Sequence, residues 1–508
     1  MPHNNKYLQP RGITRASAVY LLLAVSGLSF CFFLGFPFDN HNESYIWLVR
    51  LSQNNLVTTA TRQIVGGIET FRPLGMANAW LGYRLTGNIY LQQILNWLFA
   101  VSSFILLFAA AGNKILFSFF SFIICTCFFS GYIYLFHLHG VFYGPFQLYV
   151  SGLVYIATRQ RKLSSSLLVL ISLITLVVSL YHTFALLVFC AFLAGYLLQL
   201  SKKEKASEYI KLIFAIVLTL AFAKLILVSK EMKSLQALTN GLLASFRLAE
   251  VSKNFGWIAT ALTLFTIVPL IKNITNRFIA GCGIILISIL LIYAGIPVLM
   301  LWVAACILKT ITEKNMVMTA LIAATAILPL GSSSGSPTYV VFVLMICAFA
   351  TAENKILYIA DSIVLKRISV TVIVLLAICL FAIKKGYRVP GASSAITPLL
   401  AEQEKTRQLK NIIAWKLANK EYATFGIALY DSTELPVNSK NAVIRTERPV
   451  ARQGDLDGYL DYFSGEKHGS NAGKPQQLYI TFGNKILQNK QLIFSVQGPW
   501  NGQACVFK

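Results

Sequence analysis

The sequence predicts an α-helical polytopic membrane protein with a soluble α+β domain at its C-terminal end. Of the 508 residues, 56% are apolar and only 13% are charged, and mean hydropathy is positive, which is outside the range of soluble globular proteins. The apolar runs are long and rich in Leu, Ile and Phe, so they match helical spans of about 20 residues rather than the short alternating strands of a membrane barrel. Beyond residue 385 the composition becomes mixed and polar.

The N-terminal element resembles the start of a signal peptide. Lys6, Arg11 and Arg15 stand directly before the first apolar run. That run is too long for a signal peptide, and no small-residue cleavage site precedes "FPFDN". We therefore expect a retained signal anchor whose N-terminus lies in the cytoplasm.

Thirteen apolar runs are the predicted membrane spans. The weakest, 298–309, is short and follows Pro297. Merging it with 278–296 would give a helix of about 48 Å at ~1.5 Å per residue, much longer than the roughly 30 Å hydrocarbon core, so the two stay separate. In order, the predicted spans are 16–35, 90–112, 115–136, 140–158, 165–181, 183–200, 210–229, 256–271, 278–296, 298–309, 316–330, 338–352 and 369–384.

The basic residues alternate with these spans. Short connectors such as "HLHG", "YHT" and "GSSSGS" contain no Lys or Arg, whereas the connectors between them are basic. An excess of Lys and Arg marks the cytoplasmic side, so about thirteen spans put the N-terminus inside and the C-terminus outside. The basic connector residues are Lys114, Arg159, Arg161, Lys162, Lys202, Lys203, Lys205, Lys211, Lys272, Arg277, Lys309, Lys314, Lys355, Lys366 and Arg367.

This distribution also explains the formal charge of +24 without a nucleic acid, because the bases are spread over connectors rather than gathered in one domain. We expect membrane lipids as partners and no nucleic acid. Eight of the nine cysteines lie inside apolar runs, so no disulfide framework is predicted.

The C-terminal part, 386–508, reads as a soluble domain outside the membrane, following a transmembrane domain formed by 1–385. The stretch "KKGYRVPGASSAITP" reads as the linker between them. Apolar residues at helical spacing predict a helix over 399–422. The alternation of apolar and polar residues predicts strands in "FGIALYD", "QQLYITFG" and "QLIFSVQG".

Titratable residues gather on the predicted outer side. The first outer loop, 36–89, contains Asp39, Glu43 and Arg72, whereas the predicted helix centres are nearly free of ionisable groups. Uncharged centres disfavour an ion-coupled transporter and favour chemistry at the membrane surface. Four of the six histidines fall at outer membrane ends: His41, His137, His139 and His182.

Asp39 and Glu43 are the candidate catalytic residues. On a helix, their i, i+4 spacing would place both carboxylates on one face. One could take the proton of an acceptor hydroxyl during a single inverting displacement while the other orients the acceptor. Alternatively, Asp39 caps an interfacial helix and Glu43 stabilises its first turn.

Arg72 is the candidate for binding a phosphate, since a guanidinium held near the membrane by Pro73 could bind it bidentately and stabilise its charge. His137, His139 and His182 could assist. The alternatives are that Arg72 contacts lipid headgroups or caps a carbonyl, and that the histidines are interfacial hydrogen-bonding residues.

No cofactor is expected. A zinc ion bound by the three histidines is the weaker alternative, because H-x-H spacing is poor evidence and no cysteine lies nearby. The loop "GSSSGSP" lacks the strand and the Lys of a phosphate-binding loop. The aromatic-rich segment 132–149 could stack on sugar rings or form an interfacial belt.

The layout resembles the GT-C class of membrane glycosyltransferases. The residues that carry the resemblance are "FDNHNE", with Asp39, and "FRPLG", with Arg72. Length and layout are most similar to the bacterial and phage-borne glucosyltransferases that modify O-antigen and convert serotype. The paired acids of many relatives are spread here as D-x-x-x-E, so the choice between Asp39 and Glu43 stays open.

This resemblance implies a hexosyltransferase of the bacterial inner membrane with its active site facing the periplasm. An undecaprenyl-phosphate-linked sugar, glucose in these relatives, would be the donor, and a lipid-linked glycan would be the acceptor. Two alternatives share the lipid-linked substrate: an O-antigen ligase or polymerase, whose large polar loop usually lies between later spans, and a flippase or transporter, which the uncharged helix centres disfavour.

Overall fold

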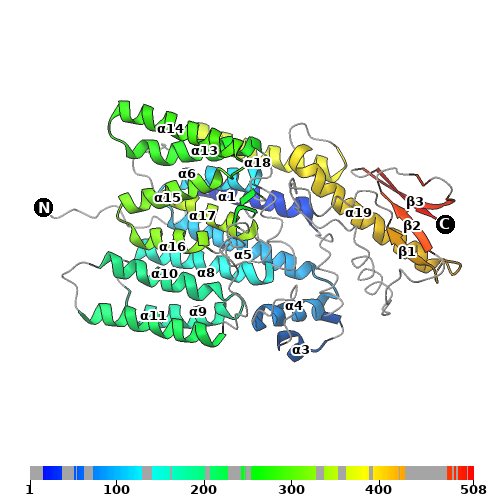
Figure 1. The fold of residues 1–508 in the computed structure, drawn as a ribbon, viewed down its shortest axis with the longest axis horizontal. Coiled ribbons are helices and arrows are strands. Elements are labelled where there is room, and N and C mark those ends of the chain that lie inside the picture. The colour runs from blue at the N-terminus through cyan, green and yellow to red at the C-terminus, as the bar shows by residue number, and fades with distance from the viewer. Residues whose placement is uncertain are drawn as a thin grey trace. The chain divides into compact units, whose positions relative to one another are not determined.

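The computed structural model is mostly helical, with a small β-sheet near the C-terminal end (Figure 1). This secondary structure agrees with the helical part and the C-terminal α+β part of the predicted fold class. The structure describes residues 15–36, 51–52, 54–61, 72–128, 140–160, 163–200, 206–226, 242–244, 246–247, 253–327, 337–352, 362–387, 393–422, 424–429, 477–482, 486–487, 490–499 and 502–508.

A helix lies at each of the thirteen predicted apolar runs. These helices are α1 (Arg15–Gly35), α5 (Tyr90–Ala110), α6 (Lys114–Cys127), α8 (Gly140–Arg159), α9 (Ser165–Ser179), α10 (Phe184–Gln199), α11 (Ala206–Ile226), α13 (Lys253–Ile267), α14 (Ile274–Tyr293), α15 (Leu299–Thr312), α16 (Met316–Ile327), α17 (Pro337–Ala352) and α18 (Ile363–Lys384). The described residues also form α3 (Leu56–Thr61), α4 (Pro73–Thr86), the short 3₁₀ helix Val268–Leu270 and α19 (Ser393–Ala418).

Four of the described helices are long and apolar enough to cross a membrane: Ser17–Gly35, Tyr90–Ala110, Ile274–Tyr293 and Ile363–Lys384. Shorter apolar helices accompany them, so the expectation of membrane helices is supported. The total of thirteen spans and their orientation stay predictions. Side chains such as Phe278, Leu290 and Phe381 are exposed on α14 and α18, where a soluble protein would rarely expose so much apolar surface.

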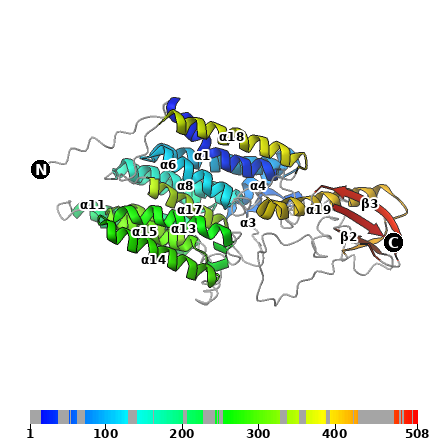
Figure 2. The same cartoon turned by 90° about the horizontal axis from the view of Figure 1, so that it is seen from above.

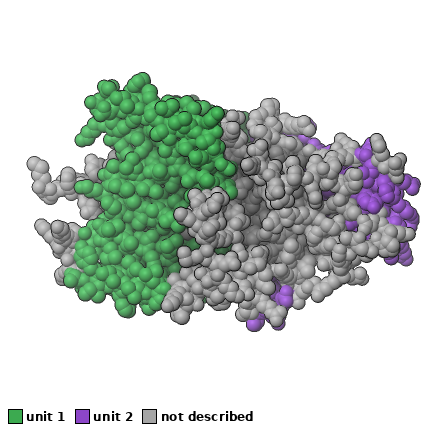
Figure 3. Space-filling view, viewed as in Figure 1, with its two compact units in different colours: residues 1–32, 60–78, 94–378 green, residues 33–59, 79–93, 379–508 purple. Residues whose placement is uncertain are grey.

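The chain divides into two compact units (Figure 3). Unit 1 comprises 1–32, 60–78 and 94–378, and unit 2 comprises 33–59, 79–93 and 379–508. The domain boundary expected between 385 and 386 stays a prediction.

Within unit 1, α17 is the most deeply buried helix. Every residue from Tyr339 to Ala352 is buried, and α17 packs against α6, α8, α15 and α16. Figures 1 and 2 show α6, α8, α15 and α17 with roughly parallel axes. A helix that is apolar on all sides fits such an interior position.

The break between α14 and α15 confirms that 278–296 and 298–309 belong to separate helices. Gly295 has a φ of 67°, a left-handed conformation that glycine adopts without a steric penalty. Its N–H donates to the Ile292 carbonyl at 3.1 Å, and the next N–H, of Ile296, donates to Leu291 at 2.8 Å. This pair of bonds is the Schellman arrangement that ends a helix, and Pro297 follows.

Several bases assigned to connectors lie within helices instead. Arg277 lies near the start of α14, Lys366 and Arg367 lie near the start of α18, and Lys309 lies in the last turn of α15. The prediction was wrong here because a helix ends at its caps rather than at the limit of its apolar run. In α14, for example, the Asn273 side chain accepts a hydrogen bond from the Thr275 N–H at 2.8 Å.

Lys309 departs furthest from its expected place. Its side chain is fully buried, donates to the Ala350 carbonyl near the end of α17 and lies 3.7 Å from a Glu313 carboxylate oxygen. A cation is favourable at the C-terminal end of a helix, so Lys309 stabilises this end of α17.

In unit 2, α19 packs against a sheet formed by β1 (Gly426–Leu429), β2 (Gln477–Thr481), β3 (Leu492–Gly498) and β4 (Gly502–Phe507). The strand order is β1-β2-β4-β3, with β1 and β2 parallel and the other pairs antiparallel. Three of these strands match the predicted ones, and β4 was not predicted.

The packing of α19 explains its position. Trp415 stacks on Phe494 of β3 with ring centroids 4.5 Å apart, and Gln408 donates to the Gly502 carbonyl at 2.7 Å. Leu409, Ile412 and Ile413 of the same helix are buried. The helix begins at residue 393, inside the stretch predicted as a linker.

Candidate functional site

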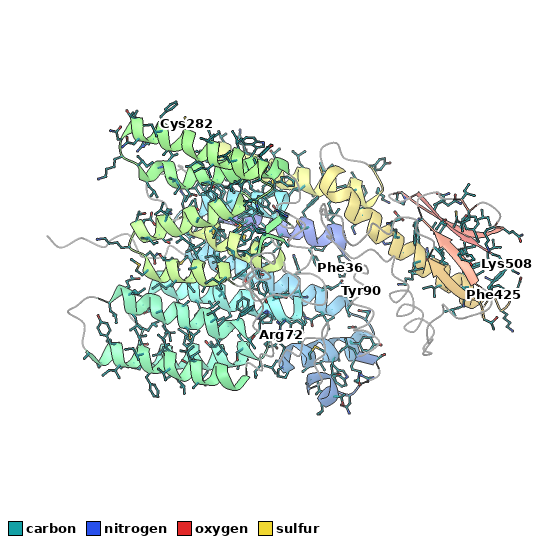
Figure 4. All side chains as sticks on the ribbon, viewed as in Figure 1. Phe36, Arg72, Tyr90, Cys282, Phe425 and Lys508 are labelled. Atoms are coloured by element: carbon teal, nitrogen blue, oxygen red, sulfur yellow. The ribbon has the colours of Figure 1, made fainter. Side chains whose placement is uncertain are left out.

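Arg72 lies at the start of α4, where its backbone carbonyl accepts a hydrogen bond from the Met76 N–H at 3.3 Å. Pro73 is the first helical residue, a position at which its fixed φ favours the helix. The N–H of Leu74 donates to the Leu180 carbonyl at 3.3 Å, which ties the start of α4 to the end of α9. Arg72 is therefore held at one end of the unit 1 helices (Figure 4).

The Arg72 guanidinium lies over the ring of Phe142, 5.0 Å from the centroid, near the start of α8. Gly75 lets the Phe142 ring pack directly against α4, because a Cβ at that position would lie 2.4 Å from a Phe142 ring carbon. The aromatic face attracts the cation and restricts its movement.

His182 lies in the short turn between α9 and α10 and is fully buried. The backbone N–H of Phe184 donates to its Nδ1 at 3.3 Å, and its Nε2 forms a hydrogen bond with the Tyr339 hydroxyl at the start of α17. Since Nδ1 accepts, the proton of the neutral ring is on Nε2.

Aromatic rings surround His182. Tyr143 and Phe146 of α8 lie 5.4 and 5.2 Å from it, centroid to centroid, and Phe184 lies at 5.1 Å. Tyr339 meets the imidazole edge-on at 5.4 Å and meets Tyr143 edge-on at 5.0 Å. The ends of four helices thus meet around one buried imidazole.

Two effects keep this imidazole neutral. Burial lowers the pKa of His182 well below its usual range, and the positive charge of Arg72 lowers it further. The cluster therefore carries the charge of Arg72 together with two tyrosine hydroxyls, a combination suited to an anionic group.

The structure brings together two of the predicted site residues, Arg72 and His182. The other four, Asp39, Glu43, His137 and His139, lie outside the described residues. The catalytic roles of Asp39 and Glu43 and the phosphate-binding roles of His137 and His139 therefore stay predictions.

Among the described residues, no group of three or more His, Cys, Asp or Glu is placed to bind a metal ion. His182 has both ring nitrogens in contact with the chain, so a metal would have to displace Phe184 or Tyr339. The proposed zinc set also includes His137 and His139, so that alternative stays untested.

Sequence reasoning missed Tyr143 and Tyr339 as site residues. Tyr143 belongs to the aromatic segment 132–149, which did signal that rings gather here. Tyr339 had no such local signal, because its contact with His182 spans 157 residues of sequence.

Arg72, Tyr143, His182 and Tyr339 therefore form one connected cluster, here named the Arg72 cluster. No protein-family model, curated protein sequence or solved structure matches this chain.

Proposed function

We propose that this protein is a membrane glycosyltransferase. It moves a sugar, glucose by resemblance, from undecaprenyl phosphate to a periplasmic glycan acceptor such as O-antigen, with inversion at the anomeric carbon. The bacterial inner membrane is its proposed location, with the site and the C-terminal domain facing the periplasm.

The observation that carries the proposal is the Arg72 cluster. It joins a guanidinium to tyrosine hydroxyls at the ends of apolar helices, where a phosphate attached to a long lipid tail would lie. Arg72 suits such a group because its planar donors match phosphate oxygens. A free sugar nucleotide would not need surroundings as apolar as these.

The proposed reaction is a single displacement. Asp39 or Glu43 takes the proton of the acceptor hydroxyl as its oxygen bonds to the anomeric carbon. The bond from that carbon to the phosphate oxygen breaks, and the electron pair leaves with the lipid phosphate. Arg72 stabilises the negative charge that builds on this leaving group.

The test replaces the two acids singly, Asp39→Asn and Glu43→Gln, in a strain that depends on this protein for glycan modification. We expect the variant that lacks the base to lose transfer by roughly 100-fold or more, because general base catalysis contributes about that much. Mass spectrometry of the glycan gives its sugar composition, and its length shows whether whole chains are moved instead.

Glu69→Gln, in the same predicted loop, is the matched control and should keep activity. Each variant must be present at the wild-type level in the membrane fraction. Full activity of both single variants would contradict the proposed role of the first outer loop.

A further inference from the structure

The hydrogen bonds within the Arg72 cluster have a defined direction, beginning at His182. Because Phe184 donates to Nδ1, the Nε2–H must donate to the Tyr339 oxygen. Arg72 also interacts with this hydroxyl, and a guanidinium has donors only. The two lone pairs of the Tyr339 oxygen are then both occupied.

The Tyr339 hydroxyl also interacts with Tyr143, whose ring it meets edge-on. Since the Tyr339 oxygen accepts from His182 and Arg72, its own proton goes to the Tyr143 oxygen. The two rings meet edge-on with centroids 5.0 Å apart, which allows this contact. Tyr143 therefore accepts from Tyr339, and its own proton is directed away from it.

Tyr143 is less buried than Tyr339 and His182. Tyr339 and His182 are buried, whereas Tyr143 is half-buried, as is Arg72. Tyr143 also follows Phe142, the ring on which the Arg72 guanidinium lies. The Tyr143 hydroxyl and the Arg72 guanidinium both interact with the buried Tyr339 hydroxyl, which also forms a hydrogen bond with His182.

We propose that the Tyr143 hydroxyl and the Arg72 guanidinium bind the same phosphate group, and that Tyr339 and His182 are positioning residues that aim the Tyr143 proton at it. The inference rests on the proposed function, in which this phosphate belongs to the polyprenyl donor and leaves with the lipid. Tyr143 then donates a hydrogen bond to a non-bridging phosphate oxygen.

The test measures binding of farnesyl phosphate to the purified full-length protein in detergent, independently of sugar transfer. Farnesol supplies the apolar chain without phosphate, and inorganic phosphate supplies the anion without the chain. We expect wild-type protein to bind farnesyl phosphate more tightly than either, and Tyr143→Phe to bind it roughly tenfold more weakly, as for loss of a hydrogen bond to a charged group. Farnesol binding should not change.

A double-variant comparison tests the positioning role. Because Tyr339 acts through Tyr143, the pair Tyr143→Phe and Tyr339→Phe together should bind no more weakly than Tyr143→Phe alone. His182→Gln, which keeps a side-chain N–H, should bind more tightly than His182→Leu. A double variant that binds more weakly than Tyr143→Phe alone, or equal binding by the two His182 variants, would contradict the positioning role.

Tyr155→Phe is the matched control, since Tyr155 lies near the other end of α8 with an arginine, Arg159, 4.8 Å over its ring. It should bind like wild type. If wild-type protein prefers farnesyl phosphate but Tyr143→Phe binds it equally well, the inference fails and the proposed function stands. If wild type does not prefer farnesyl phosphate to farnesol, the proposed donor class fails and the inference fails with it.

Discussion

Arg72 supplies the positive charge of the candidate site, and its surroundings select for a guanidinium. It lies over the Phe142 ring, 5.0 Å from the centroid, while interacting with the Tyr339 hydroxyl, and a planar guanidinium with several donors suits both contacts. A lysine ammonium keeps the charge and has three N–H donors, but it lacks the planar, forked arrangement of donors that binds a phosphate bidentately. The contacts around Arg72 therefore favour the shape of a guanidinium as well as a positive charge.

We predict that Arg72→Lys lowers transfer by roughly tenfold or more, with most of the loss in kcat because the leaving phosphate gains charge in the transition state. Steady-state kinetics with a short-chain prenyl-phosphate sugar would measure it. Arg84→Lys is the matched control, since Arg84 of the same helix lies 5.2 Å over Trp80. Equal kinetics for Arg72→Lys and wild type would contradict the role of the guanidinium.

His182 makes stability depend on pH. Its pKa is lowered in the folded protein by burial and by Arg72, whereas in the unfolded chain it titrates near its ordinary value of about 6.5. Below that value the unfolded chain binds a proton that the folded protein does not, so the free energy of unfolding falls as pH falls.

We predict that the thermal midpoint in detergent declines between pH 7 and pH 5 by an amount that corresponds to up to about 1.4 kcal/mol per pH unit from this residue. The His182→Gln protein should show a shallower decline. Among the described residues that face the ring, Arg72, Tyr143 and Tyr339 are titratable or charged, and Arg72 alone carries a charge near neutral pH. Parallel pH curves for the two proteins would refute this assignment.

At the scale of elements, glycine decides how closely α10 and α16 approach. A Cβ at Gly195 would lie 2.6 Å from the Val317 Cα, a backbone atom that cannot move by itself. In α14, a Cβ at Gly283 would meet nothing within 4 Å. Small residues of this kind allow helices in membranes to pack closely.

The two glycines should therefore respond oppositely to the same change. We predict that Gly195→Ala destabilises the protein by about 1–3 kcal/mol through overpacking. Gly283→Ala should be neutral or stabilise by up to about 1 kcal/mol, because alanine favours the helix. Thermal unfolding in one detergent compares them, and a stabilised Gly195→Ala protein would show that the two helices can separate at little cost.

Sequence patterns predicted the helices of this protein better than its strands and its long-range contacts. Apolar runs located the helices, and Pro297 correctly separated α14 from α15, because these signals are local. Strand β4, "GQACVF", was missed because its inner and outer faces do not alternate clearly: four consecutive residues from Ala504 to Phe507 are buried. The contact of His182 with Tyr339 depends on the packing of α17 and could not be read from either local segment.

At the scale of the whole molecule, the alternation of bases predicts which side of the membrane each connection occupies. We predict that alkaline phosphatase fused after Lys508 or after Tyr181 is active, because both positions are expected outside, where this enzyme folds. A fusion after Asn113, between α5 and α6, should be inactive. An inactive fusion after Lys508 together with an active one after Asn113 would reverse the predicted orientation.

The burial of α17 distinguishes it from α14 and α18, whose apolar side chains are largely exposed. In the proposed bilayer, a change in lipid thickness would act first on those outer helices, which can tilt in response. Because α17 is enclosed by protein, Tyr339 keeps its depth relative to Arg72 when the surrounding lipid changes. The enclosed helix therefore makes the spacing within the Arg72 cluster insensitive to membrane composition.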